Sequence, residues 1–400
     1  MAGSEPLNIV NIEDFFHPDA GYQINILPKY LAKRGHRVTI ITSEMEKIPE
    51  HLTAFFGRDN IEERDRAFEE ARGVRVIRLP LRRFVSGRAI FAPGLMEAVK
   101  AQAPDVLYVH GNDTFTGMWA TWNRKKFGCP LVLDSHMLEM ASVNPMRKAF
   151  RLFYRTFVTP IVRREGIPVI RTQDDPYVEK FLGIPLAQAP WISYGSDTML
   201  FHPDPERKRA FRRENGIPED AFVAVYAGKL DESKGGMLLA ELTCRPLSTE
   251  REVVWLVVGN TSGAYGAQVE AAFRESPCRV LRFPTQKYSG LAPFFQAADL
   301  AVFPKQCSLS FYDVQACGLP VLTEDNSINV DRCSHRNGWN FRAGDLEDFA
   351  SKLEDILRLP CQEFERVSMN ALSLIREQYD YEKKAGEYEA VLLDSVREHR

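Results

Sequence analysis

The stretch Phe303–Val321, with the sequence FPKQCSLSFYDVQACGLPV, contains the most informative pattern of the chain. An apolar run leads into it and predicts a buried strand that ends at Pro304. A polar loop with two serines follows, and then a helix of one or two turns that stops at Gly318. Ser310 and Asp313 have the spacing of a capping box, and the free N–H groups at such a helix start attract anions. The stretch therefore predicts a phosphate site behind a buried strand.

Length and composition narrow the class of protein. A chain of 400 residues has room for two domains, and 44% hydrophobic with 26% charged residues is typical of a globular protein. The net charge of −3 gives no reason to expect nucleic acid as a partner. The seven cysteines are scattered without a Cys-x-x-Cys pair, which favours reduced thiols over a disulfide framework or a zinc site. With no apolar run of membrane-spanning length and no secretion signal, we expect a cytoplasmic protein.

Apolar runs alternate with amphipathic segments along the chain, which predicts parallel sheets flanked by helices. We expect strands at 7–12, 37–42, 74–79, 106–110, 131–134, 169–172, 222–227, 253–259, 280–283, 300–303 and 320–323. The pattern breaks at Gly195, Pro203 and Pro205, a reasonable domain boundary. The predicted fold is α/β, with doubly wound, Rossmann-like domains at 1–195 and 196–380 and a ligand cleft between them. Residues 381–400 are expected to form a C-terminal helix that can pack back on the N-terminal domain.

A second loop of the C-terminal half has phosphate-binding character. It reads AGKLDESKGG at residues 227–236, after one predicted strand and before a helix. Lys229 and Lys234 would supply point charges for a diphosphate, while the small residues allow the backbone to approach. An ordinary solvated turn, with both lysines facing water or the neighbouring acids, is the alternative.

Both loops resemble the donor-binding elements of retaining GT-B glycosyltransferases, the glycosyltransferase family 4-like, group 1 enzymes. The second loop is similar to their Gly-Arg-Leu-x3-Lys-Gly element, with Lys229 in place of the arginine. Further short matches follow in the family's order at 35–39, 105–110, 193–203 and 297–299. The resemblance implies a GT-B fold and transfer of a sugar from a nucleotide-diphosphate donor with retention of configuration. It also implies that no side-chain nucleophile is needed.

The resemblance also implies site residues in this chain. The C-terminal domain would bind the donor's phosphates and ribose, and a glycine amide of the N-terminal domain would approach the phosphates. The donor-binding residues would be Gly21, Lys229, Lys234, Ser308, Leu309, Ser310 and Asp313. Capping of the short helix is the alternative role for the serines and for Asp313.

Lys305 departs from the family pattern, because it stands where the first glutamate of the Glu-x7-Glu pair is expected. The lysine could pair with an acidic donor sugar, or it could stabilise the leaving phosphate in an altered pose. A third interpretation is that it points to solvent and the pair has lost its role. We count Lys305 as a catalytic candidate together with His136.

His136 follows the predicted strand LVLDS at its carboxyl end, which is the cleft side of the sheet. The corresponding histidine of the family approaches the donor sugar or the reaction centre, although a histidine at a strand end is often structural. His110 and Asn112, after the preceding strand, are candidates on the acceptor side. No metal or other cofactor is predicted, because neither Asp134–His136 nor Asp174–Asp175 has the carboxylate spacing of a magnesium site. The lysines and helix starts would neutralise the phosphate charge instead.

Residues 146–164 contain six arginines and lysines, no acid, and interleaved aromatic residues. This composition is typical of a helix that contacts a membrane surface, and such a helix would suit a lipid-linked acceptor. A packed amphipathic helix with solvated arginines is the alternative. The membrane interpretation predicts a peripheral position at the inner membrane surface.

The sequence thus predicts a glycosyltransferase that moves a sugar from a nucleotide sugar to a glycan, a lipid-linked or a small-molecule acceptor. Two other classes remain open. A sugar-nucleotide 2-epimerase shares the GT-B architecture and would act on the donor alone. A non-catalytic subunit would bind nucleotide or glycan without releasing nucleoside diphosphate, and Lys305 in place of glutamate makes it plausible.

Overall fold

The computed structural model describes residues 5–53, 56–139 and 145–399. The chain divides into two compact units. The N-terminal unit runs to Tyr194 and also includes the segment from Tyr381 on, and the C-terminal unit is Gly195–Asp380. The chain thus leaves the first unit next to the predicted boundary at 195 and returns to it for its last helix. Among the described residues, no helix combines the length and the apolar character that a membrane span needs.

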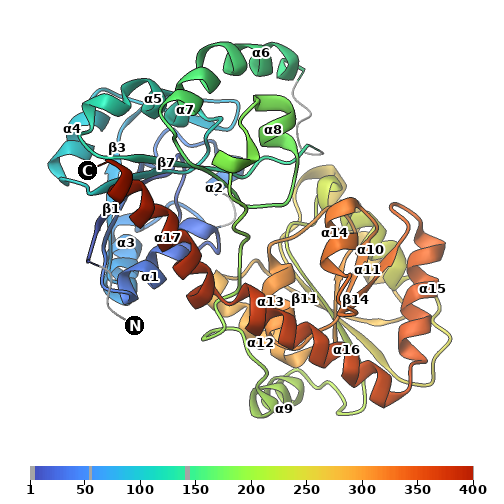
Figure 1. The fold of residues 1–400 in the computed structure, drawn as a ribbon. Helices are drawn as coiled ribbons and strands as arrows, with labels where there is room; N and C mark the ends of the chain where they lie inside the picture. The colour runs from blue at the N-terminus through green and yellow to red at the C-terminus, as the bar shows by residue number, and fades with distance from the viewer. Residues whose placement is uncertain (1–4, 54–55, 140–144, 400) are drawn as a thin grey trace. The chain divides into compact units, whose positions relative to one another are not determined.

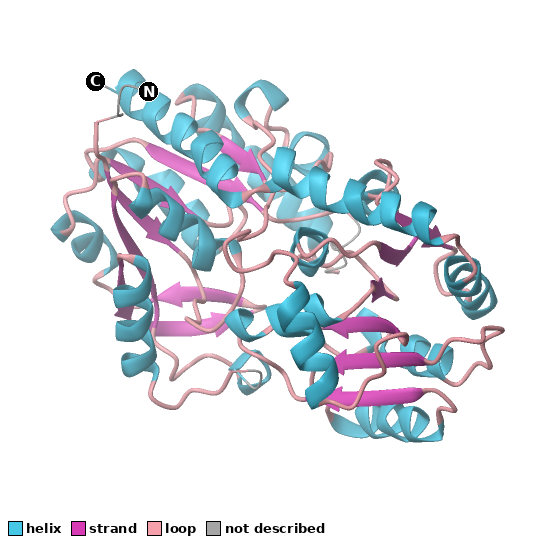
Figure 2. Ribbon diagram, turned by 90° about the horizontal axis from the view of Figure 1, so that it is seen from below, coloured by secondary structure: helices cyan, strands magenta, loops and turns pink. Residues whose placement is uncertain are grey.

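The N-terminal unit is built on a parallel sheet, whose strands are drawn as arrows in Figures 1 and 2. Its six strands have the order β3-β2-β1-β6-β7-β8. Its strands are β1 (Asn8–Ile12), β2 (Arg37–Ser43), β3 (Val74–Leu79), β6 (Val106–Val109), β7 (Leu131–Ser135) and β8 (Val169–Arg171). An antiparallel hairpin, β4 (Leu81–Val85) and β5 (Arg88–Phe91), follows β3. The helices are α1 (Gln23–Lys33), α2 (Glu50–Thr53), α3 (Ile61–Arg72), α4 (Leu95–Ala101), α5 (Phe115–Asn123), α6 (Arg147–Phe157), α7 (Thr159–Arg164), α8 (Tyr177–Leu182) and α17 (Tyr381–His399).

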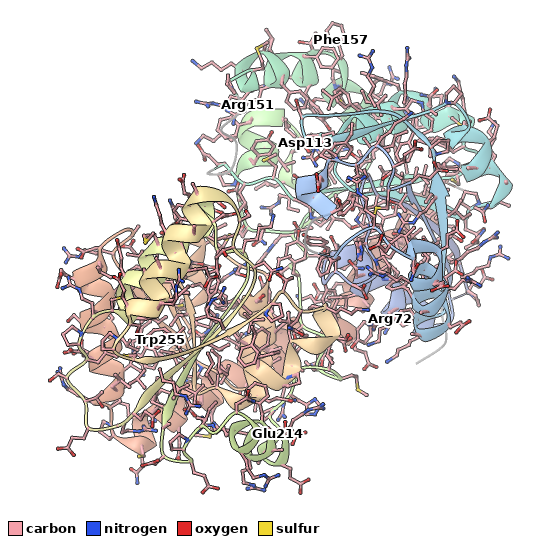
Figure 3. The ribbon with its side chains drawn as sticks, turned by 180° about the vertical axis from the view of Figure 1, so that it is seen from behind. Arg72, Asp113, Arg151, Phe157, Glu214 and Trp255 are labelled. Atoms are coloured by element: carbon pink, nitrogen blue, oxygen red, sulfur yellow. The ribbon has the colours of Figure 1, made fainter. Side chains whose placement is uncertain are left out.

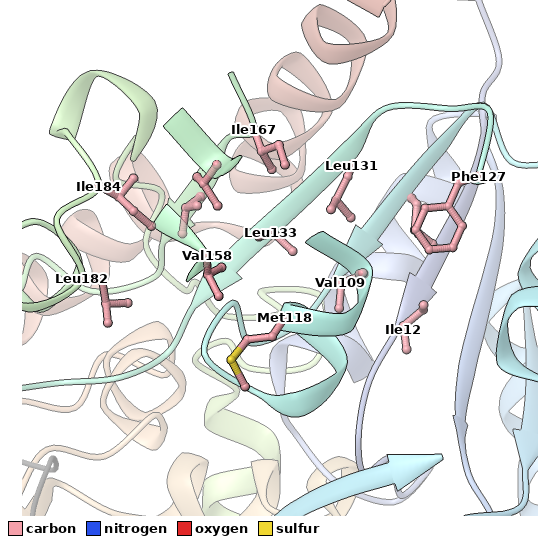
Figure 4. Close-up of a cluster of buried hydrophobic side chains, with 14 of the residues drawn as sticks. Ile12, Val109, Met118, Phe127, Leu131, Leu133, Val158, Ile167, Leu182 and Ile184 are labelled. Carbon is pink, nitrogen blue, oxygen red and sulfur yellow. The ribbon is translucent and has the colours of Figure 1, made fainter. Parts of the chain in front are cut away.

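The strands of this sheet are buried on both faces, as parallel strands covered by helices must be. On one face, side chains of β1, β6 and β7 such as Ile12, Val109 and Leu133 pack against α5 and α7 (Figure 4). On the other face α17 lies beside α1. Glu389 of α17 is held there by Arg34 Nε at 2.7 Å and His36 Nε2 at 2.7 Å. The last helix is therefore an integral layer of the N-terminal unit.

The C-terminal unit repeats the same topology, with the strand order β11-β10-β9-β12-β13-β14. Its strands are β9 (Phe222–Ala227), β10 (Val253–Val258), β11 (Arg279–Phe283), β12 (Leu300–Phe303), β13 (Val321–Glu324) and β14 (Gly338–Phe341). Its helices are α9 (Pro205–Glu214), α10 (Gly236–Thr243), α11 (Gly263–Glu275), α12 (Ala292–Ala297), α13 (Ser310–Ala316), α14 (Ser327–Arg332), α15 (Leu346–Leu357) and α16 (Cys361–Leu374). The core includes the fully buried Trp255 of β10, which Figure 3 labels inside this unit.

The predicted α/β fold with two doubly wound sheets is confirmed, and the predicted strands lie within one or two residues of the observed ones. The sequence did not predict β14 or the β4–β5 hairpin. The hairpin strands are short and carry exposed arginines at Arg82 and Arg83, so they lack the alternating apolar pattern of a half-buried strand.

Candidate functional site

In each sheet the strand order reverses between two neighbouring strands, which is where open α/β sheets bind ligands beyond their carboxyl ends. In the N-terminal unit these strands are β1 and β6, paired through Ile12 and Val109. Glu13 follows β1 directly, and His110 follows β6 with its N–H donating to the Ile12 carbonyl at 2.9 Å. Ionisable side chains therefore stand at the reversal point of this sheet.

Asp134 is the centre of a buried polar cluster at this edge. It lies near the end of β7 and is fully buried. Its Oδ1 accepts a hydrogen bond from the Gly111 N–H at 2.7 Å, and its Oδ2 accepts one from the Tyr108 hydroxyl at 2.8 Å. His110 Nδ1 lies 2.8 Å from Oδ2, and His136 Nε2 lies 2.9 Å from Oδ1. Burial alone would raise the pKa of Asp134, but the two imidazoles outweigh it and hold that pKa far below its usual range.

His136 is the member of the cluster that reaches the surface, since its side chain is 35% exposed. Its Nε2 faces Asp134, and its Nδ1 forms a short contact with the Tyr194 hydroxyl. Burial of the imidazole opposes protonation, but the Asp134 carboxylate outweighs it and holds the pKa of His136 well above its ordinary value. His136 therefore presents a positive charge at the sheet edge. Because both ring nitrogens are engaged, it is not placed as a free general base.

Glu13 is a further site residue that the sequence reasoning missed. It is half-buried at the end of β1, and among the described residues its carboxylate has no hydrogen-bond partner. Burial raises the pKa of Glu13 to about 7, although His110 and His136 act to lower it. An acid directly after an apolar strand was the signal in the sequence. A carboxyl group that titrates near neutral pH is suited to binding or deprotonating a hydroxyl.

The two residues predicted on the acceptor side are buried, His110 at 2% and Asn112 at 0% exposure. The His110 ring centroid lies 4.4 Å from that of Tyr108 in a tilted arrangement, and Asn112 Nδ2 donates to the Tyr154 hydroxyl at 3.1 Å. In this packing they support His136 and do not line a surface, so direct contact with an acceptor stays a prediction. Gly21 precedes Tyr22, the N-cap of α1, in the loop after β1.

His110, Asp134 and His136 each place one potential metal ligand within 4.8 Å of the others. Both imidazoles already form ion pairs with Asp134, and its two oxygens also accept hydrogen bonds from Tyr108 and Gly111. The potential ligand atoms therefore already have partners within the protein and form a network of charged hydrogen bonds. A metal ion would have to displace these bonds to bind here.

In the C-terminal unit the strand order reverses between β9 and β12, and the loops after these strands touch each other. A Cβ added at Gly235 would lie 3.0 Å from the Lys305 Cβ and 3.3 Å from that of Pro304. At the next loop, Gly259 has φ +147° and a Cβ there would lie 2.0 Å from the Gly228 carbonyl oxygen. Glycine is therefore required where these loops approach most closely.

Three cations gather around these loops. Lys234 is partly buried, and its Nζ donates to the Cys307 carbonyl at 3.0 Å. Burial lowers the pKa of Lys234; Cys307 and Asp231 act to raise it, and the nearby charges of Lys229 and Arg332 act to lower it. Arg332, in α14, donates to the Ser308 carbonyl at 2.9 Å and lies over the rings of Phe311 and Tyr312. The sequence reasoning missed Arg332, because it is separated from the phosphate-loop pattern by a strand. Mutually repelling cations at a reversal point form a suitable anion site.

Lys305 lies on the neighbouring loop, and its exposed Nζ donates to the Glu232 carbonyl at 3.1 Å. Ser308 Oγ accepts a weak bond from the Ser310 N–H at 3.3 Å, and Leu309 is the N-cap of α13. The predicted capping box was wrong, because the α13 N-cap makes no side-chain hydrogen bond. Arg332 instead fixes the loop through the Ser308 carbonyl.

Asp313 explains the missing capping box, because its carboxyl group points into the unit. Its Oδ1 accepts bonds from the Ser196 hydroxyl at 2.8 Å and the Tyr288 hydroxyl at 3.0 Å. Burial raises the pKa of Asp313 to about 8, although both hydroxyls act to lower it. At 5% exposure Asp313 joins three segments of this unit, and its predicted contact with a ribose stays a prediction.

The comparisons with known proteins agree with this architecture. The family model described as glycosyl transferase 4-like domain matches residues 23–166, and the model described as glycosyl transferases group 1 matches residues 221–358. The D-inositol 3-phosphate glycosyltransferase 2 of Catenulispora acidiphila is 25% identical over 272 residues, which are 63% of this chain and 62% of that protein. The D-inositol 3-phosphate glycosyltransferase of Mycobacterium leprae is 26% identical over 254 residues, 58% of this chain and 56% of that protein. The chain thus matches less than two thirds of the length of these relatives.

Solved structures share the fold over almost the whole chain. A glycosyltransferase from Rickettsia africae has a TM-score of 0.75 at 13% identity. The alignment covers 98% of this chain and 100% of the Rickettsia chain. HepE of Anabaena, solved in complex with UDP and glucose, has a TM-score of 0.71 at 16% identity and covers 97% of this chain and 100% of its own. At this level of identity the likeness concerns the fold, and it confirms the predicted GT-B class.

Proposed function

The chain belongs to the glycosyltransferases that join a 4-like domain to a group 1 domain, and on that premise we propose that it transfers a sugar from a nucleoside diphosphate sugar to an acceptor hydroxyl. In this reaction the bond between the anomeric carbon and the phosphate oxygen breaks, and the acceptor oxygen bonds to that carbon. The hydroxyl proton leaves with the departing phosphate or passes through a basic group. The nucleoside diphosphate is the second product.

The observation that best supports this proposal is the cation cluster of Lys229, Lys234 and Arg332 at the β9/β12 reversal point. A diphosphate would relieve the mutual repulsion of these charges, and a leaving diphosphate develops negative charge where they stand. HepE, which shares the fold, was solved with UDP and with UDP-glucose. A uridine or similar nucleoside diphosphate is accordingly the first donor to test.

We assign the acceptor to the edge of the N-terminal sheet, where the half-buried Glu13 follows β1 and the positive His136 follows β7, with β6 between these two strands. The imidazolium would stabilise negative charge during transfer, and Glu13 would orient the acceptor hydroxyl. Retention of configuration and independence from metal ions are part of the proposal. The lysines and Arg332 supply the charge that a metal would otherwise neutralise.

Replacement of Lys234 tests the proposal. Lys234→Ala should lower the rate of nucleoside diphosphate release about 100-fold, as removal of one charge-stabilising donor does. Lys234→Arg keeps the charge and should retain more activity than the alanine variant. Lys100→Ala, on the exposed face of α4 in the other unit, is the matched control and should behave as wild type.

The first experiment is a donor screen with UDP, GDP, ADP and their nucleotide sugars. Calorimetry measures binding, and release of nucleoside diphosphate measures turnover, each with and without a chelator. Near-normal turnover of Lys234→Ala would remove the lysine from the mechanism. Binding of UDP without any diphosphate release, across acceptors, would favour a non-catalytic subunit. An epimer formed from donor alone would favour the epimerase.

We further propose that α6 contacts an anionic membrane surface. Its apolar side chains include Leu152 at 69%, Phe157 at 56% and Phe153 at 39% exposure, and Figure 3 shows Phe157 at the outer edge of its unit. Exposed arginines at 147 and 155 flank them, and Arg151 packs on the Phe181 ring at 3.6 Å from its centroid. A helix with exposed aromatic and cationic side chains binds at a lipid interface.

Sedimentation with vesicles tests this contact. Wild type should bind vesicles with anionic headgroups and dissociate at high salt, because the charge term is screened. Leu152→Glu should weaken binding at least tenfold, since it removes apolar area and adds repulsion. Equal binding of this variant and wild type would show that α6 is not the contact.

A further inference from the structure

An apolar pocket of the N-terminal unit has no role in the site described above. It has a volume of about 520 Å³ and lies between the β4–β5 hairpin and helices α4 and α5. Its walls are mainly Ile90, Phe91, Leu95, Met96, Phe115 and Trp119. A pocket of this size and lining is typical of a site for a small molecule with a hydrocarbon part.

The pocket is continuous with exposed aromatic surface. Phe115, Trp119 and Trp122 are spaced by four and three residues on α5, so they share one face of the helix. Phe115 is 43% and Trp122 is 45% exposed. Trp122 packs edge-on against Phe153 of α6, and its Nε1 donates to the Phe157 carbonyl at 3.3 Å. The stripe thus joins the pocket to the face of α6 proposed to contact a membrane.

The hairpin beside the pocket is cationic. Its residues 81–91 include Arg82, Arg83 and Arg88 and no acid. Arg82 lines the pocket, and neither it nor Arg83 has an ion-pair partner among the described residues. Among the described residues that line the pocket, Glu97 is the one acid. An unpaired arginine at the edge of an apolar pocket favours a ligand with a hydrocarbon chain and an anionic headgroup.

The pocket also adjoins the proposed acceptor edge. Asp14, next to Glu13, accepts a hydrogen bond from the Thr116 hydroxyl at 2.5 Å and from the Ala89 N–H at 3.2 Å. Thr116 and Ala89 both line the pocket. The buried Asp14 carboxylate thus connects the hairpin and α5 to the end of β1 through hydrogen bonds. A chain held in the pocket would carry its headgroup close to Glu13.

We propose that this pocket binds the hydrocarbon chain of an anionic lipid, and that the acceptor of the transferase is a lipid of this class. The second clause rests on the function proposed above. The chain enters along the aromatic stripe of α5, Arg82 holds the anionic group, and the hydroxyl that accepts the sugar lies at the sheet edge.

Calorimetry with octyl, decyl and dodecyl phosphate, below their critical micelle concentrations, tests the pocket on the full-length chain. Affinity should rise about fourfold with each added methylene until the pocket is full. Neutral alkyl maltosides of equal chain length should bind roughly two- to fivefold more weakly at low salt. Arg82→Gln should remove this preference and leave the dependence on chain length.

Met96→Trp should fill the pocket and abolish the dependence on chain length. Phe115→Ser, at a position that is 43% exposed, should reduce affinity at least fivefold and provides a second test. Glu70→Gln, at an exposed position on α3 outside the pocket, is the matched control and should bind the monomeric phosphates as wild type does. Equal affinity for the three chain lengths, or unchanged binding in both pocket variants, would overturn the assignment.

The acceptor is tested by transfer from labelled donor to a polar lipid extract and to water-soluble D-inositol 3-phosphate. Label in the organic-extractable product, with competition by dodecyl phosphate, supports a lipid acceptor. Label only in the water-soluble product, without competition, contradicts it. UDP binding by wild type is measured separately, and its absence would contradict the proposed function. The alkyl phosphate experiment would still show whether the pocket binds a hydrocarbon chain.

Discussion

Glu13→Gln is the substitution for which the structure gives the clearest expected magnitude. Burial raises the pKa of Glu13 from 4.5 to about 7. The folded-state pKa therefore lies above the unfolded value. The stability that the neutral carboxyl group contributes is fully present below pH 4.5 and is lost as the pH rises through 7. Glutamine has nearly the same shape and stays neutral at every pH, so the variant escapes this loss.

The size of the effect follows from the shift. The folded and unfolded pKa values differ by roughly 2.5, and each pKa unit corresponds to about 1.4 kcal/mol. The unfolding free energy therefore falls by about 3 kcal/mol once the titration is complete. Part of it is already present at pH 5, where the unfolded carboxyl is largely ionised. The gain in unfolding free energy of Glu13→Gln over wild type should therefore grow by about 2.5 kcal/mol between pH 5 and pH 8.5.

Urea unfolding at the two pH values, followed by a signal of the N-terminal unit, measures this difference. Glu70→Gln, at an exposed position on α3, is the matched control and should show no growing gain. If Glu13 orients an acceptor hydroxyl, the variant should lose activity while it gains stability. A gain that is equal at pH 5 and pH 8.5, or a loss at the higher pH, would refute the assignment of a buried carboxyl with a raised pKa.

Two further outcomes follow from the buried carboxyl groups. Asp134→Asn should lower the pH at which His136 titrates in an NMR experiment, because the carboxylate that offsets its burial is gone, while the signal of the exposed His335 in the other unit should not move. The gain in unfolding free energy of Asp313→Asn over wild type should grow as the pH rises from about 4 to about 8 and level off above it, because the unfolded carboxyl ionises over this range while the folded Asp313 stays neutral. A tenfold loss of UDP affinity in the same variant would support the predicted ribose contact instead.

The strand positions could be predicted from sequence because they depend on local composition. Short apolar runs bounded by glycine, proline and polar residues identified the major strands of both sheets, and their alternation with helices implied parallel order. The two loops with phosphate-binding character also rest on local features, small residues and lysines after a buried strand. Burial of parallel strands on both faces leaves this signature in the sequence whatever the tertiary arrangement.

The tertiary structure decided which of these residues meet, because contact depends on strand order and side-chain direction. Glu13 lies near His110 and His136 only because β1 is the neighbour of β6, across almost a hundred residues of chain. Arg332 joins Lys234 because α14 returns to the loop after β12. Asp313 had the spacing of a cap but faces inward, because two hydroxyls from distant segments satisfy its carboxyl group better than a solvent-exposed helix end does.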